Sequence, residues 1–207
     1  MAISWFWFLG ASYLTQFPNF TKSHLAGDNT VVTALLVAFS VGVGIGSMLC
    51  ERLSGDRVEL GLVPIGSIGL TVFGISLYFS TPAVMPAELL SLGQFLATTF
   101  GWWVLLDLTL IGVFGGLFIV PLYAMLQQRA EPSQRARMIA ANNIFNALFM
   151  VVAALAGMLF LAGLGLNIPE YFLILAIMNA VVALYVYSTV PEFVLRFVIY
   201  LLSHTMY

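Results

Sequence analysis

The stretch GVFGGLFIVPLYAMLQQRAEPSQRARMIAANNIFNAL, from Gly112 to Leu148, decides how the chain is organised. It begins inside an apolar run, crosses a short basic connector and enters a second apolar run. The connector carries Arg129, Arg135 and Arg137. Because short cytoplasmic loops of membrane proteins carry an excess of Lys and Arg, this pattern predicts a transmembrane hairpin whose turn faces the cytoplasm.

The composition places the whole chain in the membrane. Of its 207 residues, 61% are hydrophobic and 8% are charged, and the mean hydropathy is +1.03, whereas a soluble domain usually carries about 25% charged residues. A helix needs about 20 residues to cross a hydrocarbon core of roughly 30 Å. We therefore predict an all-α, polytopic membrane protein with six transmembrane helices, at about Ile3–Phe20, Thr30–Leu49, Leu60–Phe79, Trp102–Leu126, Ile139–Leu161 and Tyr171–Val190. Residues 1–190 then form the transmembrane part, and residues 191–207 form an amphipathic tail or the start of a following cytoplasmic domain.

The positive charges fall on one side when the connectors are assigned alternately to the two faces of the bilayer. One side receives Arg52, Arg57, Arg129, Arg135, Arg137 and Arg196, and the other receives Lys22. This asymmetry predicts that both chain ends are cytoplasmic. The connector that carries Arg52 and Arg57 also pairs opposite charges, with Asp56 beside Arg57. Such pairs either anchor the topology or form a latch that breaks when the protein changes state.

Glycine and proline are concentrated in the segment before the basic connector, at Gly112, Gly115, Gly116 and Pro121. Glycine lets helix backbones approach closely, and proline frees a carbonyl that a neighbour or water must satisfy. We interpret these positions as a hinge or as a close-packed helix contact. The second span also contains a Gly-x-x-x-Gly spacing, from Gly42 to Gly46.

Five uncharged residues in or near the ends of the apolar spans are candidates for lining a substrate path: Gln16, Asn19, Tyr123, Asn143 and Asn146. An amide inside the membrane is costly unless it meets a partner or a wet cavity. Gln16 and Asn19 are three residues apart and share a helix face, and Asn142 and Asn146 are four apart. The asparagines near the basic connector either line the inner mouth of a cavity or tie the connector to the helix ends.

Asp107 is the candidate for a coupling acid. It follows the pair Trp102–Trp103, which falls at the outer boundary of its span, by about one turn. A carboxylate at that depth either reaches out to headgroup water or couples transport to proton movement.

No residue pattern supports catalysis. The chain lacks HExxH, GxSxG, P-loop and CxxC motifs, and neither His24 nor His204 has a nucleophile or a ligand set nearby in the sequence. We expect no catalytic residue, no metal site, no cofactor and no nucleic-acid partner.

Three segments resemble the second half of a lysophospholipid transporter of the major facilitator superfamily: GDNTVVTALLVAFSVGVGIGSMLCERLSG, GLVPIGSIGLTVFG and IGVFGGLFIVPLYAMLQQRAEPSQRARMIAANNIFNAL. The most specific part of the resemblance runs from Gly115 to Arg129, with the asparagines after it. The tail PEFVLRFVIYLLSHTMY is similar to the junction at which such a transporter is fused to a glycerophospholipid acyltransferase and an acyl-carrier-protein ligase.

The resemblance implies one half-bundle of a major facilitator fold, paired with an amino-terminal six-helix half in a bacterial inner membrane. It also implies that the complete protein flips lysophospholipids, such as lysophosphatidylethanolamine, to the cytoplasmic leaflet by alternating access, for reacylation. The partners are then the lipid bilayer, the lysophospholipid, the other half and a fused or associated acyltransferase. Two alternatives stay open. One is a transporter of another small solute or drug by proton antiport, and the other is a non-transporting membrane scaffold for a fused acyltransferase.

Overall fold

The computed structural model describes residues 1–54, 59–84 and 88–189, and within these ranges it contains helices and one isolated β-bridge but no strands. The helices are α1 (Ala2–His24), α2 (Asn29–Ser54), α3 (Leu62–Ser80), α4 (Leu92–Leu96), α5 (Thr99–Arg129), α6 (Arg135–Gly157), the π-helix η1 (Met158–Gly163) and α7 (Ile168–Thr189). The predicted all-α class is therefore confirmed. The predicted tail, residues 191–207, lies outside the described residues.

Within the described residues, five helices are long and apolar enough to cross a membrane, namely α2, α3, α5, α6 continued by η1, and α7. They correspond to the second to sixth predicted spans, so a multi-pass membrane protein is supported. The first predicted span also forms a helix, α1, of 23 residues. This helix carries Ser, Thr, Gln and Asn side chains along its length and is not among the five. Six spans therefore stays a prediction.

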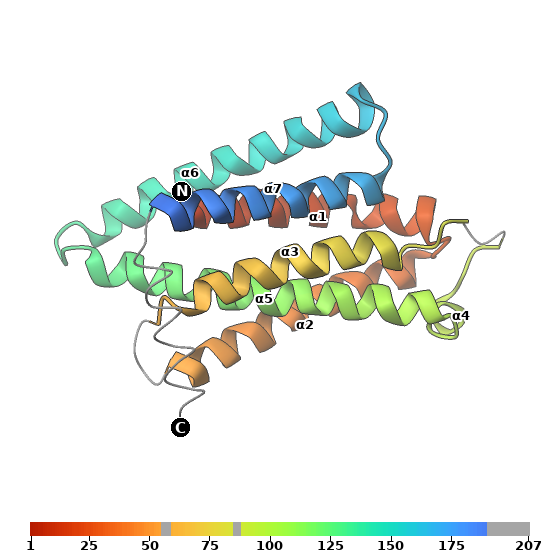
Figure 1. Ribbon diagram of the computed structural model, residues 1–207, viewed down its shortest axis with the longest axis horizontal. Coiled ribbons are helices and arrows are strands. Elements are labelled where there is room, and N and C mark those ends of the chain that lie inside the picture. Colours follow the sequence, from red (N-terminus) through yellow and green to blue (C-terminus); the bar gives the residue numbers. More distant parts are fainter. Residues whose placement is uncertain (55–58, 85–87, 190–207) are drawn as a thin grey trace.

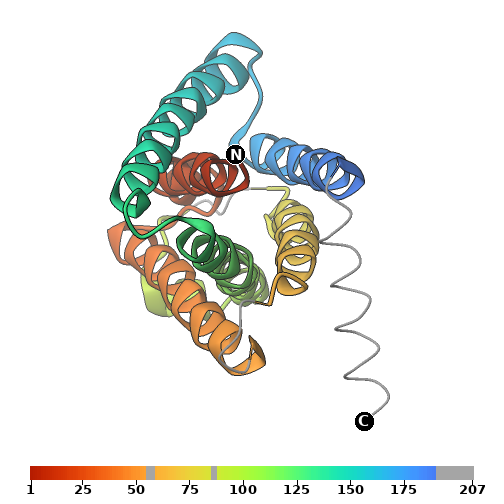
Figure 2. The ribbon, with the colours of Figure 1, turned by 90° about the vertical axis from the view of Figure 1, so that its left-hand side faces the viewer.

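The long helices alternate in direction along the bundle (Figure 1). Helix α5 packs most extensively against α2 and α3, and α1 packs most extensively against α6. The end-on view shows the same order, with α6 beside α1 and α2 beside α5 (Figure 2). In the most apolar part of α5, 61% of the residues are buried, against 22% in α2 and 17% in α6. Helices α2 and α6 therefore present most of their surface outward.

Two Gly-x-x-x-Gly pairs face each other where α2 crosses α5. A Cβ atom added to Gly42 would lie 3.1 Å from the Cα of Gly112, and one added to Gly116 would lie 2.7 Å from the backbone nitrogen of Ser47 and 2.8 Å from the backbone carbon of Gly46. Lipid supplies no hydrophobic force between helices, so van der Waals contact across such small residues holds the pair together. The structure thus places Gly112 and Gly116 at a close-packed contact.

The other two residues of that predicted group face different neighbours. A Cβ atom added to Gly115 would lie 3.1 Å from a ring carbon of Phe6 in α1. Pro121 is buried inside α5, which continues through it to Arg129. Helix α5 therefore meets α2 and α1 through different glycines of the same short segment.

The connectors at one end of the bundle are joined to each other. Asp28 caps α2, because its Oδ1 accepts hydrogen bonds from the backbone nitrogens of Thr30 at 2.8 Å and Val31 at 3.2 Å. The backbone nitrogen of Asp28 donates to the carbonyl of Leu90 at 3.0 Å, and the nitrogen of Leu90 donates to the carbonyl of Ala26 at 2.6 Å. These bonds tie the α1–α2 connector to the segment that leads into α4, a short helix that the sequence analysis did not predict.

Candidate functional site

Two of the predicted path residues, Tyr123 and Asn146, meet where α5, α6 and α1 come together. The side-chain amide of Asn146 lies 3.2 Å from the hydroxyl of Tyr123, and the indole nitrogen of Trp7 donates to the same hydroxyl at 3.0 Å. Asn146 is only 5% exposed, although most of α6 is exposed. One asparagine therefore joins α6 to two other helices.

The orientation of the Asn146 amide follows from its neighbours. With its oxygen turned toward Tyr123, the amide accepts hydrogen bonds from the Tyr123 hydroxyl at 3.2 Å and from Asn142 Nδ2 at 3.0 Å, and its nitrogen donates to the Ser4 hydroxyl at 3.0 Å. This orientation gives both ends of the amide a partner, which a buried polar group requires. We refer to Ser4, Trp7, Tyr123, Asn142 and Asn146 as the Asn146 cluster.

The predicted residues Gln16 and Asn19 form a second polar group on α1. Asn19 Nδ2 donates to Gln16 Oε1 at 3.3 Å, and a Cβ atom added to Gly157 of α6 would lie 4.0 Å from Gln16 Nε2. At a rise of 1.5 Å per residue, Gln16 lies about 14 Å along α1 from Trp7. The contact between α1 and α6 thus contains polar groups at two levels, and we call this contact the α1–α6 seam. Asn143, the remaining predicted path residue, is exposed on α6 and belongs to neither group.

Asp107 is held between helices rather than exposed. It is 1% exposed, and its Oδ2 accepts a hydrogen bond from the hydroxyl of Ser80, the last residue of α3, at 2.5 Å. The interpretation in which this carboxylate reaches out to headgroup water is therefore wrong, because the protein itself covers it. Its role in proton coupling stays a prediction.

In the described part of the chain, no group of three or more His, Cys, Asp or Glu residues is placed to hold a metal ion.

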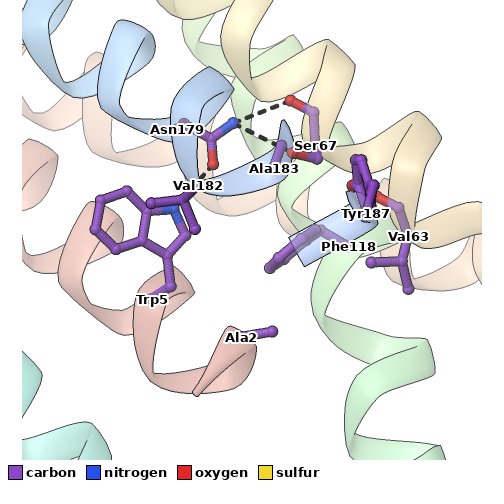
Figure 3. A pocket seen from close by; sticks show the side chains of 9 residues that line it. All are labelled: Ala2, Trp5, Val63, Ser67, Phe118, Asn179, Val182, Ala183 and Tyr187. Atoms are coloured by element: carbon purple, nitrogen blue, oxygen red, sulfur yellow. Dashed lines mark hydrogen bonds between the residues drawn. The ribbon is translucent and has the colours of Figure 1, made fainter. Parts of the chain in front are cut away.

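A third polar group, centred on Asn179 of α7, was missed by the sequence analysis. Asn179 is 2% exposed, accepts a hydrogen bond from the indole nitrogen of Trp5 at 3.0 Å, and donates to the carbonyl of Ser67 at 3.0 Å (Figure 3). It also donates to the hydroxyl of Thr71 at 2.9 Å. Beside it lies a cavity of about 20 Å³. The signal was present in the sequence, since a single amide in an apolar span is costly without partners and so predicts a contact with other helices.

The predicted positive charges gather at one end of the bundle. The end of α2, the end of α5 and the start of α6 lie at the same end, and the end of α1 lies at the other (Figure 1). These helix ends carry the exposed side chains of Arg52, Arg129, Arg135 and Arg137 on the first side and of Lys22 on the second. Arg57 and Arg196, which the sequence also predicts on the first side, and Asp56 beside Arg57 lie outside the described residues.

Comparison with known proteins connects this arrangement to a family. A family model described as the Major Facilitator Superfamily matches residues 1–197. The chain is also 33% identical over 119 residues to the lysophospholipid transporter LplT of Citrobacter koseri, a match that covers 56% of this chain and 25% of the relative. The chain thus spans about a quarter of the length of the curated relative that it matches. No solved structure matches the chain.

Proposed function

The chain belongs to the major facilitator superfamily, and on that premise we propose that it forms one six-helix half of a transporter that moves lysophospholipids by alternating access. The match to the superfamily extends over nearly the whole chain. The named relative is a lysophospholipid transporter, which supports the proposed substrate class. In this proposal α1, the first helix of the chain, also crosses the membrane and brings the number of spans to six. Its hydropathy is lower because it carries the polar side chains that a substrate path needs.

The observation that carries the proposal is the α1–α6 seam. A lysophospholipid has a polar headgroup and one acyl chain, so it needs a line of polar groups inside an otherwise apolar bundle. The Asn146 cluster and the pair Gln16–Asn19 supply uncharged donors and acceptors at two levels of α1. Such a pair of levels suits a headgroup that moves stepwise along one helix while its acyl chain stays in apolar surroundings.

Glycines on the surfaces of α1 and α2 favour the packing of a second helical bundle against this chain. Gly10 on α1 and Gly44 on α2 have nothing within 4 Å of a Cβ atom added to them, so packing within the described chain does not require glycine there. Glycine on an outward helix face leaves room for the backbone of another helix. We propose that the amino-terminal half of the transporter packs against α1 and α2 at these glycines, and that rocking of the two halves gives alternating access.

We further propose that the arginine end of the bundle faces the cytoplasm of a bacterial inner membrane, with both chain ends on that side. This orientation follows the rule that cytoplasmic loops carry the excess of Lys and Arg. It would deliver the lysophospholipid to the leaflet where a fused or associated acyltransferase acts.

The test is a translocation assay with lysophosphatidylethanolamine in vesicles that contain this chain together with a complementary half-transporter. We expect saturable inward movement, a rate at least about tenfold lower for Gln16→Ala and Asn146→Ala, and an unchanged rate for Val181→Ala, a control at a 60% exposed position of α7. We expect no transport by the chain alone, because one wall of the path is then missing. Movement of another solute but not of lysophosphatidylethanolamine by the paired halves would contradict the substrate class.

The buried carboxylate of Asp107 favours a second candidate function, proton-coupled antiport of another small solute. Buried acids in membrane helices often serve proton transfer. Asp107→Asn keeps the shape of the side chain, so the pH dependence of uptake in the paired halves separates the two functions. If the dependence on a proton gradient is unchanged in Asp107→Asn, antiport through this residue is excluded.

A further inference from the structure

Two buried hydroxyl groups of the bundle, those of Ser12 on α1 and Tyr171 on α7, have no partner at full hydrogen-bonding geometry among the described residues, and the one weaker polar interaction of the Tyr171 hydroxyl is with Ser12. Ser12 is 2% exposed and Tyr171 is fully buried. Buried polar groups are nearly always hydrogen-bonded, and an unpaired one in a native structure calls for an explanation. Neither hydroxyl belongs to the Asn146 cluster or to the Asn179 group.

Both side chains lie next to the Gln16 level of the α1–α6 seam. Ser12 precedes Gln16 by one helical turn and therefore shares its face of α1. A Cβ atom added to Gly157 of α6 would lie 3.8 Å from the hydroxyl oxygen of Tyr171 and 4.0 Å from Gln16 Nε2. A tyrosine hydroxyl and a glutamine amide thus meet α6 at a residue that has no side chain to bond them.

Helix α6 changes its geometry at this point. After Gly157 the chain continues as the π-helix Met158–Gly163, in which no residue is buried. A π-helix is rare, and here it ends α6 rather than interrupting it. Segments with few buried contacts open locally at lower free energy than the core does. This end of α6 contains no buried side chain, and the ring of Phe160, whose centroid lies 5.9 Å from that of Tyr171, must move with it when the seam opens.

We propose that Ser12 and Tyr171 bind the headgroup of the transported lysophospholipid through its hydrogen-bond-accepting oxygens, once α6 moves away from α1 and α7 at Gly157. This inference rests on the proposed function and specifies one binding level within it. Two neutral hydroxyl donors and the Gln16 amide suit phosphate or glycerol oxygens. In the closed arrangement the hydroxyls are covered and have no polar neighbour but each other, and the headgroup supplies well-placed acceptors when the seam opens.

The first test compares Ser12→Ala and Tyr171→Phe with Tyr13→Phe, whose hydroxyl already donates to the carbonyl of Phe172 at 3.5 Å. The measurements are thermal unfolding and equilibrium binding of lysophosphatidylethanolamine, both made on this chain paired with a complementary half-transporter in nanodiscs. Removing an unpaired hydroxyl should leave the melting temperature unchanged or raise it, and should raise the Kd about tenfold, as expected for one lost hydrogen bond to a charged group. Tyr13→Phe should lower the melting temperature and leave the Kd within about twofold.

The outcomes separate this inference from the proposed function. If the unchanged protein binds lysophosphatidylethanolamine and both variants bind it equally well, the headgroup site is overturned and the transport proposal stands. If the unchanged protein does not bind this lipid at all, the substrate class fails and the headgroup site fails with it.

A second measurement tests the opening of the seam, first in the absence of lysophosphatidylethanolamine and then in its presence. In a Cys50→Ala background, which removes the one native thiol, Ser12→Cys should react slowly with a small water-soluble thiol reagent. Bound lysophosphatidylethanolamine should slow the reaction further. The control is Val31→Cys, at a fully buried position of α2, which should not react. Equal lack of reaction at positions 12 and 31 would show that α6 does not separate, and would overturn the inference.

Discussion

Two asparagines hold this bundle together through their side chains. Asn146 joins α6 to α1 and α5, and Asn179 joins α7 to α1 and α3. In the apolar part of a bilayer an amide has no water to bond, so each asparagine fixes the position of its helix relative to its partners. Each asparagine thereby links helices that are far apart in sequence.

Asn179→Ala should reduce stability by about 1–2 kcal/mol, because it leaves the indole nitrogen of Trp5 without an acceptor and removes the bonds that Asn179 donates to Ser67 and Thr71. Asn143→Ala, at an exposed position of α6, should change stability by less than about 0.5 kcal/mol. Thermal unfolding of the two variants in the same detergent measures the difference. Equal melting temperatures would contradict a structural role for the Asn179 group.

The cap of α2 predicts a pH dependence of stability. Asp28 accepts a hydrogen bond from the Thr30 hydroxyl at 2.5 Å, and this bond, together with the backbone donors of Val31 and Thr30, lowers the pKa of its carboxyl below the usual value. Because the folded-state pKa lies below the unfolded value of about 3.9, the contribution of Asp28 is present above about pH 4 and is lost as the pH falls through the folded-state pKa. Melting temperatures measured from pH 6 to pH 3 should therefore fall less steeply for Asp28→Asn than for the unchanged protein. Parallel curves would show that the cap does not titrate in this window.

Spacing within one helix predicted some of the polar residues and missed others. The pair Gln16–Asn19 follows from residues three apart on α1, and of the predicted asparagines on α6 Tyr123 contacts Asn146 but not Asn143. Asn179 and the hydroxyls of Ser12 and Tyr171 were missed. Their environment depends on which helices are neighbours, and no spacing within a single helix contains that information.

At the scale of the elements, the crossing of α2 and α5 depends on glycine at defined positions. Gly116→Ala would place a Cβ atom 2.7 Å from the backbone nitrogen of Ser47, so the two helices must separate, at a cost of about 1–3 kcal/mol. Gly44→Ala, on α2, the other helix of this crossing, but with nothing within 4 Å of the added Cβ atom, should be neutral or stabilising by up to about 1 kcal/mol. Thermal unfolding of both variants is the measurement. A larger loss for Gly44→Ala than for Gly116→Ala would contradict the crossing described here.

The sequence predicted the long helices better than their irregular parts. Apolar runs of about 20 residues gave the positions of α2, α3, α5, α6 and α7, because a span must satisfy its backbone hydrogen bonds within itself. The π-helix at Met158–Gly163 and the short helix α4 were not predicted. The π-helix ends α6, and α4 lies in the connector between α3 and α5, and apolar length does not specify the backbone geometry of either.

At the scale of the whole molecule, the orientation in the membrane can be tested at two positions. In a Cys50→Ala background, Lys22→Cys should react with a membrane-impermeant thiol reagent added to intact cells, and Arg135→Cys should react only after the membrane is permeabilised. This result follows from the excess of arginine at the end of the bundle that contains Arg135. Reaction at position 135 with protection at position 22 would reverse the proposed orientation.

The joined connectors at the other end of the bundle have a consequence for amide proton exchange. The backbone nitrogens of Asp28 and Leu90 lie outside every helix, yet both donate to carbonyls of the opposite connector. Their deuterium uptake should therefore be slow, unlike that of ordinary loop amides. Rapid labelling at both positions, with the helices still protected, would report that the two connectors part before the bundle itself unfolds.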